Sequence, residues 1–409
     1  MDYFDYDPSI TDEQRDVCAA AHVFARDVLR PTGIALDRLP ADEVVAPGSA
    51  LYDVLRQGAE LGYTRLRAPA MVGGLGMSAE TSYLVNEELA WGNLGLAAVI
   101  FLAATHADVA LLTGDSDVIQ EFALPYYASS DGSIRGCWAI TEPDHGSDWL
   151  CNMRPEMQVN ARAQVQARAD GDHWILNGQK SAWVSNAPLA THAMLNVQLD
   201  PTGGLEQSGV CLLPLSLVGI SRGRALDKHG ARTLPQGELF FEDVRIPRRW
   251  MVVQPDTYAR YMHNHLAGFN AGVGCIATGL ARAAYECALT YTKERVQGGR
   301  PIFEHQSVRA RLFRMFALVH AARSLSRDAY VSAVTYIRTG AAARLEYSIS
   351  SKVFCTQSAL EVATLGVQLL GGNGMTKEYP AEMFLRDAAA LTIADGENNL
   401  LSQVGASLL

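Results

Sequence analysis

Three long helical runs near the end of the chain constrain its fold most strongly. Residues 266–295, 308–338 and 344–365 each repeat apolar side chains at the spacing of an α-helix. Long amphipathic helices bury their apolar stripes against one another, and this is the pattern of a helical bundle. The segment from residue 247 to residue 409 is therefore predicted to be a helical domain.

The first 132 residues also predict helices. A capping-box start lies at residues 11–14, which read TDEQ. Apolar positions keep helical spacing after Ser49 and again after Ser78. Strand alternation of comparable quality does not occur in this part of the sequence. We therefore expect an all-helical N-terminal domain over residues 1–132.

Between the two helical parts the period of the sequence changes to that of strands. Candidate strands lie at residues 134–140, 165–169, 173–176, 193–199, 210–213 and 238–241. The turn pairs Asp170-Gly171 and Asn177-Gly178 fall between or directly after some of them. A small β-barrel or sandwich over residues 133–246 follows. The chain is thus predicted to be an α+β multidomain protein in which a β domain separates two helical domains.

Length, composition and charge exclude some classes of protein. A chain of 409 residues is too long for one ordinary core. Its 48% hydrophobic and 19% charged residues are typical of a globular protein rather than a disordered one. The formal net charge of −10 argues against a nucleic-acid surface, because such a surface needs clustered Lys and Arg.

The cysteines and the apolar runs indicate where in the cell the protein is expected. The seven cysteines form no C-x-x-C pair, so we expect neither a metal site nor a disulfide framework, and a cytoplasmic location is the simplest. Residues 1–5 are acidic and lack the order of a signal peptide. The apolar run at 94–112 is interrupted by His106 and Asp108, which predicts a buried core helix rather than a membrane span.

The densest group of glycines, acids and amides lies in the last forty residues. Residues 366–374 read GVQLLGGNG, residues 378–380 read EYP, and residues 394–399 read ADGENN. This order resembles the flavin-binding and catalytic tail of the acyl-CoA dehydrogenase superfamily. Most members of that superfamily have a glutamate before the last of these glycines, whereas this chain has Asp395. The resemblance implies a helical domain, a β domain and a C-terminal four-helix bundle.

A second motif follows the first candidate strand. Residues 138–148 read WAITEPDHGSD, in which proline and glycine bend the chain and hydroxyl and backbone N–H groups can face a planar heterocycle. Alone, this would be a surface turn. The segment matches the T-E-P-x-x-G-S-D signature of the superfamily, and the resemblance implies that Ile140, Thr141 and Ser147 contact the flavin or the thioester.

A third motif, NGQKSAWVSN, occupies residues 177–186. An indole can pack on a flavin beside a hydroxyl partner, although a lone Trp in a β domain is more often a core residue. The resemblance implies that Trp183 and Ser185 contact the flavin. The spacing between Lys180 and Trp183 is one residue longer than in many members, which predicts a local bulge.

The segment from Arg295 to Gln306 resembles the part of the superfamily that reaches the dinucleotide end of FAD across a subunit interface. A pyrophosphate favours a guanidinium and closely approaching backbone N–H groups. The resemblance implies a homo-oligomer, a tetramer or a dimer, with an electron-transferring flavoprotein among the candidate partners. The further FAD ligands that it implies are Arg295, Gln306, Gln368, Gly371, Gly372, Glu397 and Asn399.

The reaction implied by the resemblance is oxidation of an acyl thioester, carried by CoA or by a carrier protein, to the enoyl thioester. A carboxylate removes the α-proton while flavin N5 accepts the β-hydride. Asp395 occupies the position of this base, with a side chain one methylene shorter. Asn270 stands where many members have an arginine; it can donate a hydrogen bond to Asp395 but adds no charge. Ser147, Asn270 and Gly396 are the expected substrate contacts.

Several alternatives remain open at this point. The string Asp395 to Asn398 also resembles nitroalkane oxidase, a member of the same superfamily that uses an aspartate and passes electrons to oxygen. A flavin-binding protein without catalysis is a third reading. If Asp395 is not the base, Glu87 and Glu88 are the next candidates, with a solvated face expected for at least one of them. The basic residues in 221–232 could meet CoA phosphates or an acidic carrier protein, or be solvated.

Overall fold

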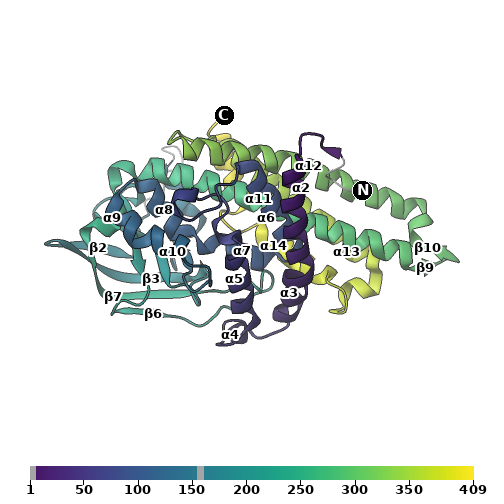
Figure 1. The fold of residues 1–409 in the computed structure, drawn as a ribbon, viewed down its shortest axis with the longest axis horizontal. Helices are drawn as coiled ribbons and strands as arrows, with labels where there is room; N and C mark the ends of the chain where they lie inside the picture. The colour runs from purple at the N-terminus through teal and green to yellow at the C-terminus, as the bar shows by residue number, and fades with distance from the viewer. Residues whose placement is uncertain (1–5, 154–160) are drawn as a thin grey trace.

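The computed structural model describes residues 6–153 and 161–409; the acidic start at residues 1–5 lies outside them. The helices of residues 12–60 lie across the middle of the molecule, and those of residues 105–128 lie beside the sheet at one end (Figure 1). The long helices of the last region run from above the sheet to the opposite end (Figure 1). The order of helical, β and helical regions is the one that the sequence predicts.

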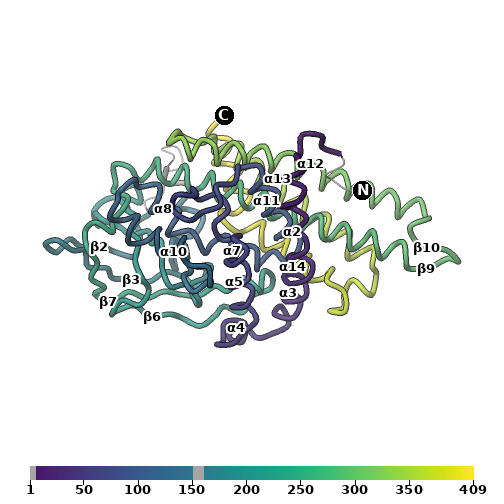
Figure 2. Tube along the Cα trace, viewed as in Figure 1, coloured from purple at the N-terminus to yellow at the C-terminus, as the bar shows by residue number. Residues whose placement is uncertain are grey.

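The N-terminal region is helical throughout. Its α-helices are α2 (Asp12–Phe24), α3 (Arg30–Asp37), α4 (Ala41–Val44), α5 (Ala50–Glu60), α6 (Ala79–Gly92), α7 (Leu94–Ala103), α8 (Thr105–Thr113), α9 (Ser116–Val118) and α10 (Leu124–Ala128). The capping box predicted at the start of α2 is present, because Thr11 and Gln14 bond each other's backbone N–H groups. The trace in Figure 2 shows α2 and α3 crossing over the bundle helices.

Two helical segments, Leu94–Thr113 and Leu345–Met375, are long and apolar enough to cross a membrane by length and composition. In the first of them, 78% of the apolar window is buried inside the molecule, and in the second 50% is buried. The first segment comprises α7 and α8 and packs in the core, which is the burial that the sequence predicts for residues 94–112.

The middle region forms an eight-stranded sheet. Its strands are β1 (Gly136–Ala139), β2 (Gln166–Asp170), β3 (His173–Ser185), β4 (His192–Gln198), β5 (Ser208–Pro214), β6 (Ile220–Arg222), β7 (Gln236–Pro247) and β8 (Met251–Val253). The order across the sheet is β6-β7-β3-β2-β4-β5-β8, and β1 pairs in parallel with β4. The two longest strands, β3 and β7, are antiparallel neighbours.

All six candidate strands are present, and the differences concern short or irregular pieces. The sequence missed β6 and β8, each of three residues, because so short a strand shows no alternation. It also stopped β3 before Asn177, where polar residues and a register shift interrupt the pattern. Since β8 pairs with β5, the sheet extends beyond the expected boundary at residue 246.

The last region is built of α11 (Pro255–Glu294), α12 (Gln306–Arg338), α13 (Leu345–Leu370), α14 (Ala381–Leu391) and α15 (Asn398–Ala406). The helices α11 and α13 pack against each other, and both contribute small buried residues, such as Ala277, Ala281 and Ala359, to one hydrophobic core. A short hairpin of β9 (Val296–Gln297) and β10 (Arg300–Pro301) connects α11 to α12 at the far end of the molecule from the sheet (Figure 1).

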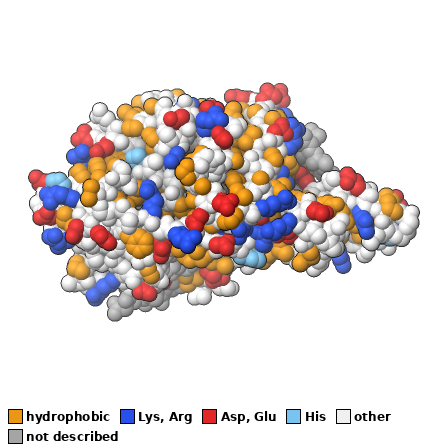
Figure 3. All heavy atoms as spheres, turned by 90° about the horizontal axis from the view of Figure 1, so that it is seen from below, with side chains coloured by type: hydrophobic (Ala, Val, Ile, Leu, Met, Phe, Trp, Pro, Cys, Tyr) orange, Lys and Arg blue, Asp and Glu red, His pale blue; other side chains and the backbone are white. Residues whose placement is uncertain are grey.

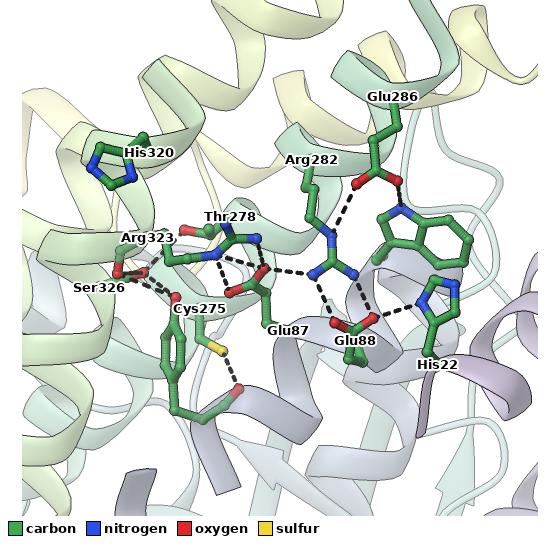
Figure 4. Close-up of polar contacts among 12 residues, drawn as sticks. His22, Glu87, Glu88, Cys275, Thr278, Arg282, Glu286, His320, Arg323 and Ser326 are labelled. Atoms are coloured by element: carbon green, nitrogen blue, oxygen red, sulfur yellow. Dashed lines mark hydrogen bonds and ion pairs between the residues drawn. The ribbon is translucent and has the colours of Figure 1, made fainter. Parts of the chain in front are cut away.

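A buried cluster of ion pairs joins α6 of the first region to the bundle. Arg282 on α11 donates to Glu87 at 3.0 Å and to Glu88 at 2.7 Å, and Arg323 on α12 donates from Nε to Glu87 at 3.0 Å (Figure 4). The side chains of Glu87 and Glu88 are only 2% and 4% exposed. His22 on α2 adds a contact of 2.8 Å to Glu88. Four helices are thus connected by one polar cluster.

We expect the substitution Glu87→Gln to destabilise the protein strongly, because it leaves Arg323 and Arg282 buried with too little negative charge around them. Removal of one partner of a buried ion pair costs about 3–5 kcal/mol. Thermal unfolding followed by circular dichroism would show a clearly lower midpoint. The matched control is Glu361→Gln, which removes the exposed partner of Arg314 and should leave the midpoint nearly unchanged. Equal midpoints for the two variants would contradict the argument.

Candidate active site

The bend between α14 and α15 carries Asp395. Asp395 has a φ of 52° and Gly396 a φ of 106°, both in the left-handed region. Asp enters this region more readily than most side chains, and glycine does so freely. A Cβ on Gly396 would lie 2.7 Å from Cδ1 of Leu150, so a side chain there would have to displace its neighbours. The backbone therefore turns sharply at Asp395 and packs against the segment that follows the second motif.

Burial raises the pKa of the Asp395 carboxyl, and the positive charge of Lys352 opposes this rise. A carboxyl group in this situation is a stronger base than one in water. Asn270 on α11 donates from Nδ2 to Asp395 at 3.3 Å, as expected, but the acceptor is the main-chain oxygen and not the carboxylate. Asn270 therefore holds the backbone of the bend rather than the reacting group.

Lys352 on α13 is a residue that the sequence did not single out. It is fully buried, and its Nζ donates to the main-chain oxygen of Gly396 at 2.6 Å, to Oδ1 of Asn398 at 2.7 Å and to the main-chain oxygen of Thr392 at 3.3 Å. Burial lowers the pKa of Lys352 to about 8. The signal that could have identified it is its place in the helical run 344–365, where the only lysine lies at helical spacing from Ser348, Cys355 and Ala359.

Ser147 meets the C-terminal tail directly. The backbone N–H of Glu397 donates to Oγ of Ser147 at 3.1 Å, across 250 positions of sequence. The Glu397 carboxylate caps the start of α15 by accepting from the N–H groups of Asn399 and Leu400, and it also accepts from Nδ2 of Asn399. The structure thus brings Ser147 together with Asp395, Gly396, Glu397 and Asn399, and Asn270 joins them from α11.

The turn that contains Ile140 and Thr141 is fixed by a buried ion pair. Lys180 on β3 contacts Oε1 of Glu142 at 2.6 Å, and neither side chain is exposed. Lys180 also donates to the main-chain oxygen of Ile140 at 3.0 Å, and the N–H of Ser181 donates to the main-chain oxygen of Thr141 at 2.9 Å. Ile140 and Thr141 are partly exposed. The Glu142–Lys180 ion pair therefore fixes their position beside β3.

Trp183 and Ser185 follow on the same strand. The pairing of β3 with β7 shifts register between Lys180 and Val184, which confirms the predicted bulge. The indole of Trp183 is 57% exposed, which is unusual for so large an apolar group. Nε2 of Gln236 donates to Oγ of Ser185 at 3.0 Å and to the main-chain oxygen of Trp183 at 3.2 Å. An exposed flat ring beside a hydroxyl fits the isoalloxazine of a flavin.

The remaining expected FAD ligands lie elsewhere, at the end of the bundle that carries the β9–β10 hairpin (Figure 1). Arg295 ends α11, is exposed, and accepts a hydrogen bond from Ile302 through its main-chain oxygen. The group consists of five residues, and all of them are exposed: Arg295, Gln306, Gln368, Gly371 and Gly372. A Cβ on either glycine would meet nothing within 4 Å. An exposed guanidinium and an open glycine backbone fit a pyrophosphate.

Glu87 and Glu88 do not form a second catalytic centre. Burial would raise the pKa of Glu88, but Arg282 and His22 outweigh it and lower the pKa to about 2. Glu87 is bonded to both Arg282 and Arg323. The expectation that at least one of the two glutamates is solvated was wrong, because both lie inside the cluster of ion pairs between domains.

The basic cluster in 221–232 is largely committed to protein carbonyls. Arg222 donates to the main-chain oxygens of Ala187 and Ala190, and Arg232 donates to those of Asp37 and Leu39. Lys228 is bonded in the same way to neighbouring carbonyls. The face shown in Figure 3 has basic and acidic side chains interspersed with apolar ones. The bonds of Arg222, Lys228 and Arg232 therefore stabilise loops. The basic residues Arg222, Arg224 and His229 are nevertheless exposed, as the reading of a solvated cluster expects.

A helical domain, a β domain with an exposed tryptophan and a helical bundle with a partly buried aspartate at its last bend are the framework of an FAD-dependent oxidoreductase that acts on CH–CH bonds. The sequence matches the models of the acyl-CoA dehydrogenase N-terminal domain over residues 11–131, middle domain over 137–244 and C-terminal domain over 259–409. The chain belongs to the acyl-CoA dehydrogenase family, whose reaction is oxidation of an acyl-CoA to an enoyl-CoA.

Known proteins resemble the chain over nearly its whole length. It is 29% identical to the probable acyl-CoA dehydrogenase FadE25 of Mycobacterium tuberculosis, covering 96% of this chain and 94% of that protein. The butyryl-CoA dehydrogenase structure from Megasphaera elsdenii superposes with a TM-score of 0.85 at 27% identity, covering 98% of both chains. A structure described as the electron transferring flavoprotein of Acidaminococcus fermentans matches with the same TM-score, identity and coverage.

If Trp183 stacks on the flavin, Trp183→Ala should weaken FAD binding while leaving the fold intact. A ring stack contributes about 0.5–1.5 kcal/mol beyond area burial, so the dissociation constant should rise roughly 2- to 10-fold. Titration of the apoprotein with FAD, followed by quenching of flavin fluorescence, measures this. Trp183→Phe keeps a flat ring and should retain most of the affinity, and Met71→Ala, at a 91% exposed residue, serves as the control. Unchanged affinity in Trp183→Ala would remove the residue from the FAD site.

Proposed function

We propose that this protein oxidises an acyl thioester to the enoyl thioester, with Asp395 as the base that takes the α-proton. The observation that carries the proposal is the position of Asp395: its partly buried side chain lies on a backbone bend bonded by Asn270 and Lys352 and packed beside Ser147. Bound FAD supplies the acceptor for the hydride lost from the β-carbon. The rise in the pKa of Asp395 favours proton abstraction.

The other expected contacts have separate tasks in this proposal. Ile140, Thr141, Trp183 and Ser185 would hold the flavin ring on the β domain, where the Glu142–Lys180 pair fixes the turn. Ser147 and Gly396 would lie beside the thioester carbons near Asp395, whereas Asn270, which is fully buried, would hold the bend from behind rather than contact the substrate. The rate of such a reaction depends on placing the base and the reacting carbon within a few tenths of an ångström of each other. The hydrogen bonds of Asn270, Lys352 and Ser147 to the bend at residues 395–397 would hold the base in this way.

We further propose that a second copy of the chain completes the FAD site. Arg295, Gln306, Gln368, Gly371 and Gly372 lie at the opposite end of the molecule from the sheet and are exposed. A dinucleotide bound at Trp183 could meet such a group only from a neighbouring subunit. The proposal therefore includes a homo-oligomer, and a dimer is the smallest assembly that satisfies it.

CoA is the proposed carrier of the acyl group, because relatives that match the whole chain are named for acyl-CoA substrates. An electron-transferring flavoprotein is the proposed acceptor of the electrons, supported by the structural match described above. A carrier-protein substrate would instead require a docking surface, and the basic cluster in 221–232 is mostly occupied by carbonyl contacts.

Asp395→Asn should retain bound FAD and lose flavin reduction by substrate, because the amide cannot accept the α-proton. The measurement is anaerobic mixing of the purified protein with a panel of acyl-CoAs and acyl-pantetheines, following bleaching of the flavin absorbance. An Asp395→Asn protein that is bleached at the wild-type rate would refute the role of Asp395. Ser402→Ala, a change on the exposed side of α15, is the control for local disturbance.

The rate of flavin reduction should fall at acid pH. A base must be ionised, so the full rate is present above the pKa of Asp395 and is lost as the pH falls through it. Since burial raises this pKa, the decline should lie above the ordinary value of about 3.9 for an Asp carboxyl. Stopped-flow reduction at a series of pH values measures the decline, and a decline centred below that value would contradict the buried setting of the carboxyl.

A second candidate is an oxidase of the nitroalkane type, favoured by one observation, the aspartate at residue 395, where the resemblance leads to the expectation of a glutamate. The same panel distinguishes the two. Bleaching by nitroalkanes and not by thioesters would select the oxidase, and the absence of bleaching by either class would favour a flavin-binding protein without catalysis.

A further inference from the structure

We infer that Lys352 is a positioning residue for the proposed base: from α13 it fixes the bend that carries Asp395 and places a positive charge on the main-chain oxygen of the next residue, Gly396, 2.6 Å from Nζ. The inference rests on the proposed function of Asp395 and adds a second residue to it. Lys352 lies 43 positions before Asp395 in the sequence and in a different helix from either end of the bend.

The three N–H bonds of the Lys352 ammonium are fully used. They meet the main-chain oxygen of Gly396 at 2.6 Å, Oδ1 of Asn398 at 2.7 Å and the main-chain oxygen of Thr392 at 3.3 Å. An ammonium has three donors and no acceptor, so three oxygens satisfy it. These oxygens belong to residues on both sides of Asp395, and the bend is therefore held from before and after the base.

A second residue of α13 extends this attachment. Thr356 lies one turn after Lys352, and its Oγ1 accepts from Nδ2 of Asn398 at 3.0 Å. The N–H of Asn398 donates to the main-chain oxygen of Thr392 at 3.1 Å, which closes the loop on itself. One face of α13 thus contacts the loop through a charged residue and a neutral one, and this difference allows their effects to be separated.

A structural role alone would not require a lysine. Burial of an ammonium is costly, and burial lowers the pKa of Lys352. A neutral side chain with suitable hydrogen bonds would avoid that cost. The negative charges of Asp395 and Glu397 raise the pKa of Lys352 and so oppose the effect of burial on the lysine. The positive charge of Lys352 in turn lowers the pKa of Asp395, which burial raises. The lysine thereby keeps the base ionised at a lower pH than an apolar environment would.

The test compares Lys352→Met with Thr356→Val in the FAD-bound protein, using the substrate that bleaches the wild type. Lys352→Met should lower the rate of flavin reduction by about 10- to 100-fold, the range expected when a reacting group is misplaced by up to an ångström, with KM little changed. Its acid decline should move to higher pH. Thr356→Val should reduce the rate less and leave the acid decline where the wild type has it.

Lys352→Arg keeps the positive charge. Its rate of flavin reduction should decline at the same acid pH as that of the wild type, whether or not the rate itself recovers. If Lys352→Met does not fold, Lys352→Gln against Lys352→Arg gives the same comparison. A wild-type rate and pH profile in Lys352→Met, or an unmoved acid decline in both neutral variants, would overturn the inference. Loss of reduction in Asp395→Asn would then leave the proposed function standing, whereas wild-type reduction in Asp395→Asn would remove the proposed function itself.

Discussion

The cluster of ion pairs around Glu87 and Glu88 is the interaction on which the rest of the structure depends. It places two carboxylates and two guanidiniums in an interior where unpaired charges would be very costly, so a shift of these helices that separated the pairs would be strongly unfavourable. Fixing α6 against α11 and α12 also fixes α13, which packs along α11. The bend that bears Asp395 is held by α11 and α13 together.

The architecture and the main motifs could be predicted from the sequence because both depend on local patterns. Helical periodicity identified the bundle, and alternation identified six of the eight strands of the sheet. Even the bulge before Val184 was visible as one extra residue. The contacts between distant segments were not accessible in this way. Arg282 and Glu87 are 195 positions apart, and nothing near either residue indicates the other.

The candidate site shows the same limit. The resemblance named Asp395, Ser147 and Asn270, and the structure brings them together. It did not reveal that Asn270 bonds the backbone, or that Lys352 and the pair of Glu142 and Lys180 are the supports behind the named residues. Supporting residues of this kind act through three-dimensional packing and carry no motif of their own, so a reading of the chain alone passes over them.

The left-handed conformation at Asp395 limits which acid can stand at this position. Asp and Asn tolerate this backbone conformation better than other side chains do. A change from aspartate to the longer glutamate would therefore alter the preferred backbone shape of the bend as well as the length of the side chain. The reach of the acid and the turn of the backbone are thus coupled, and an engineered Asp395→Glu exchange would need a relaxed bend to keep the carboxylate in place.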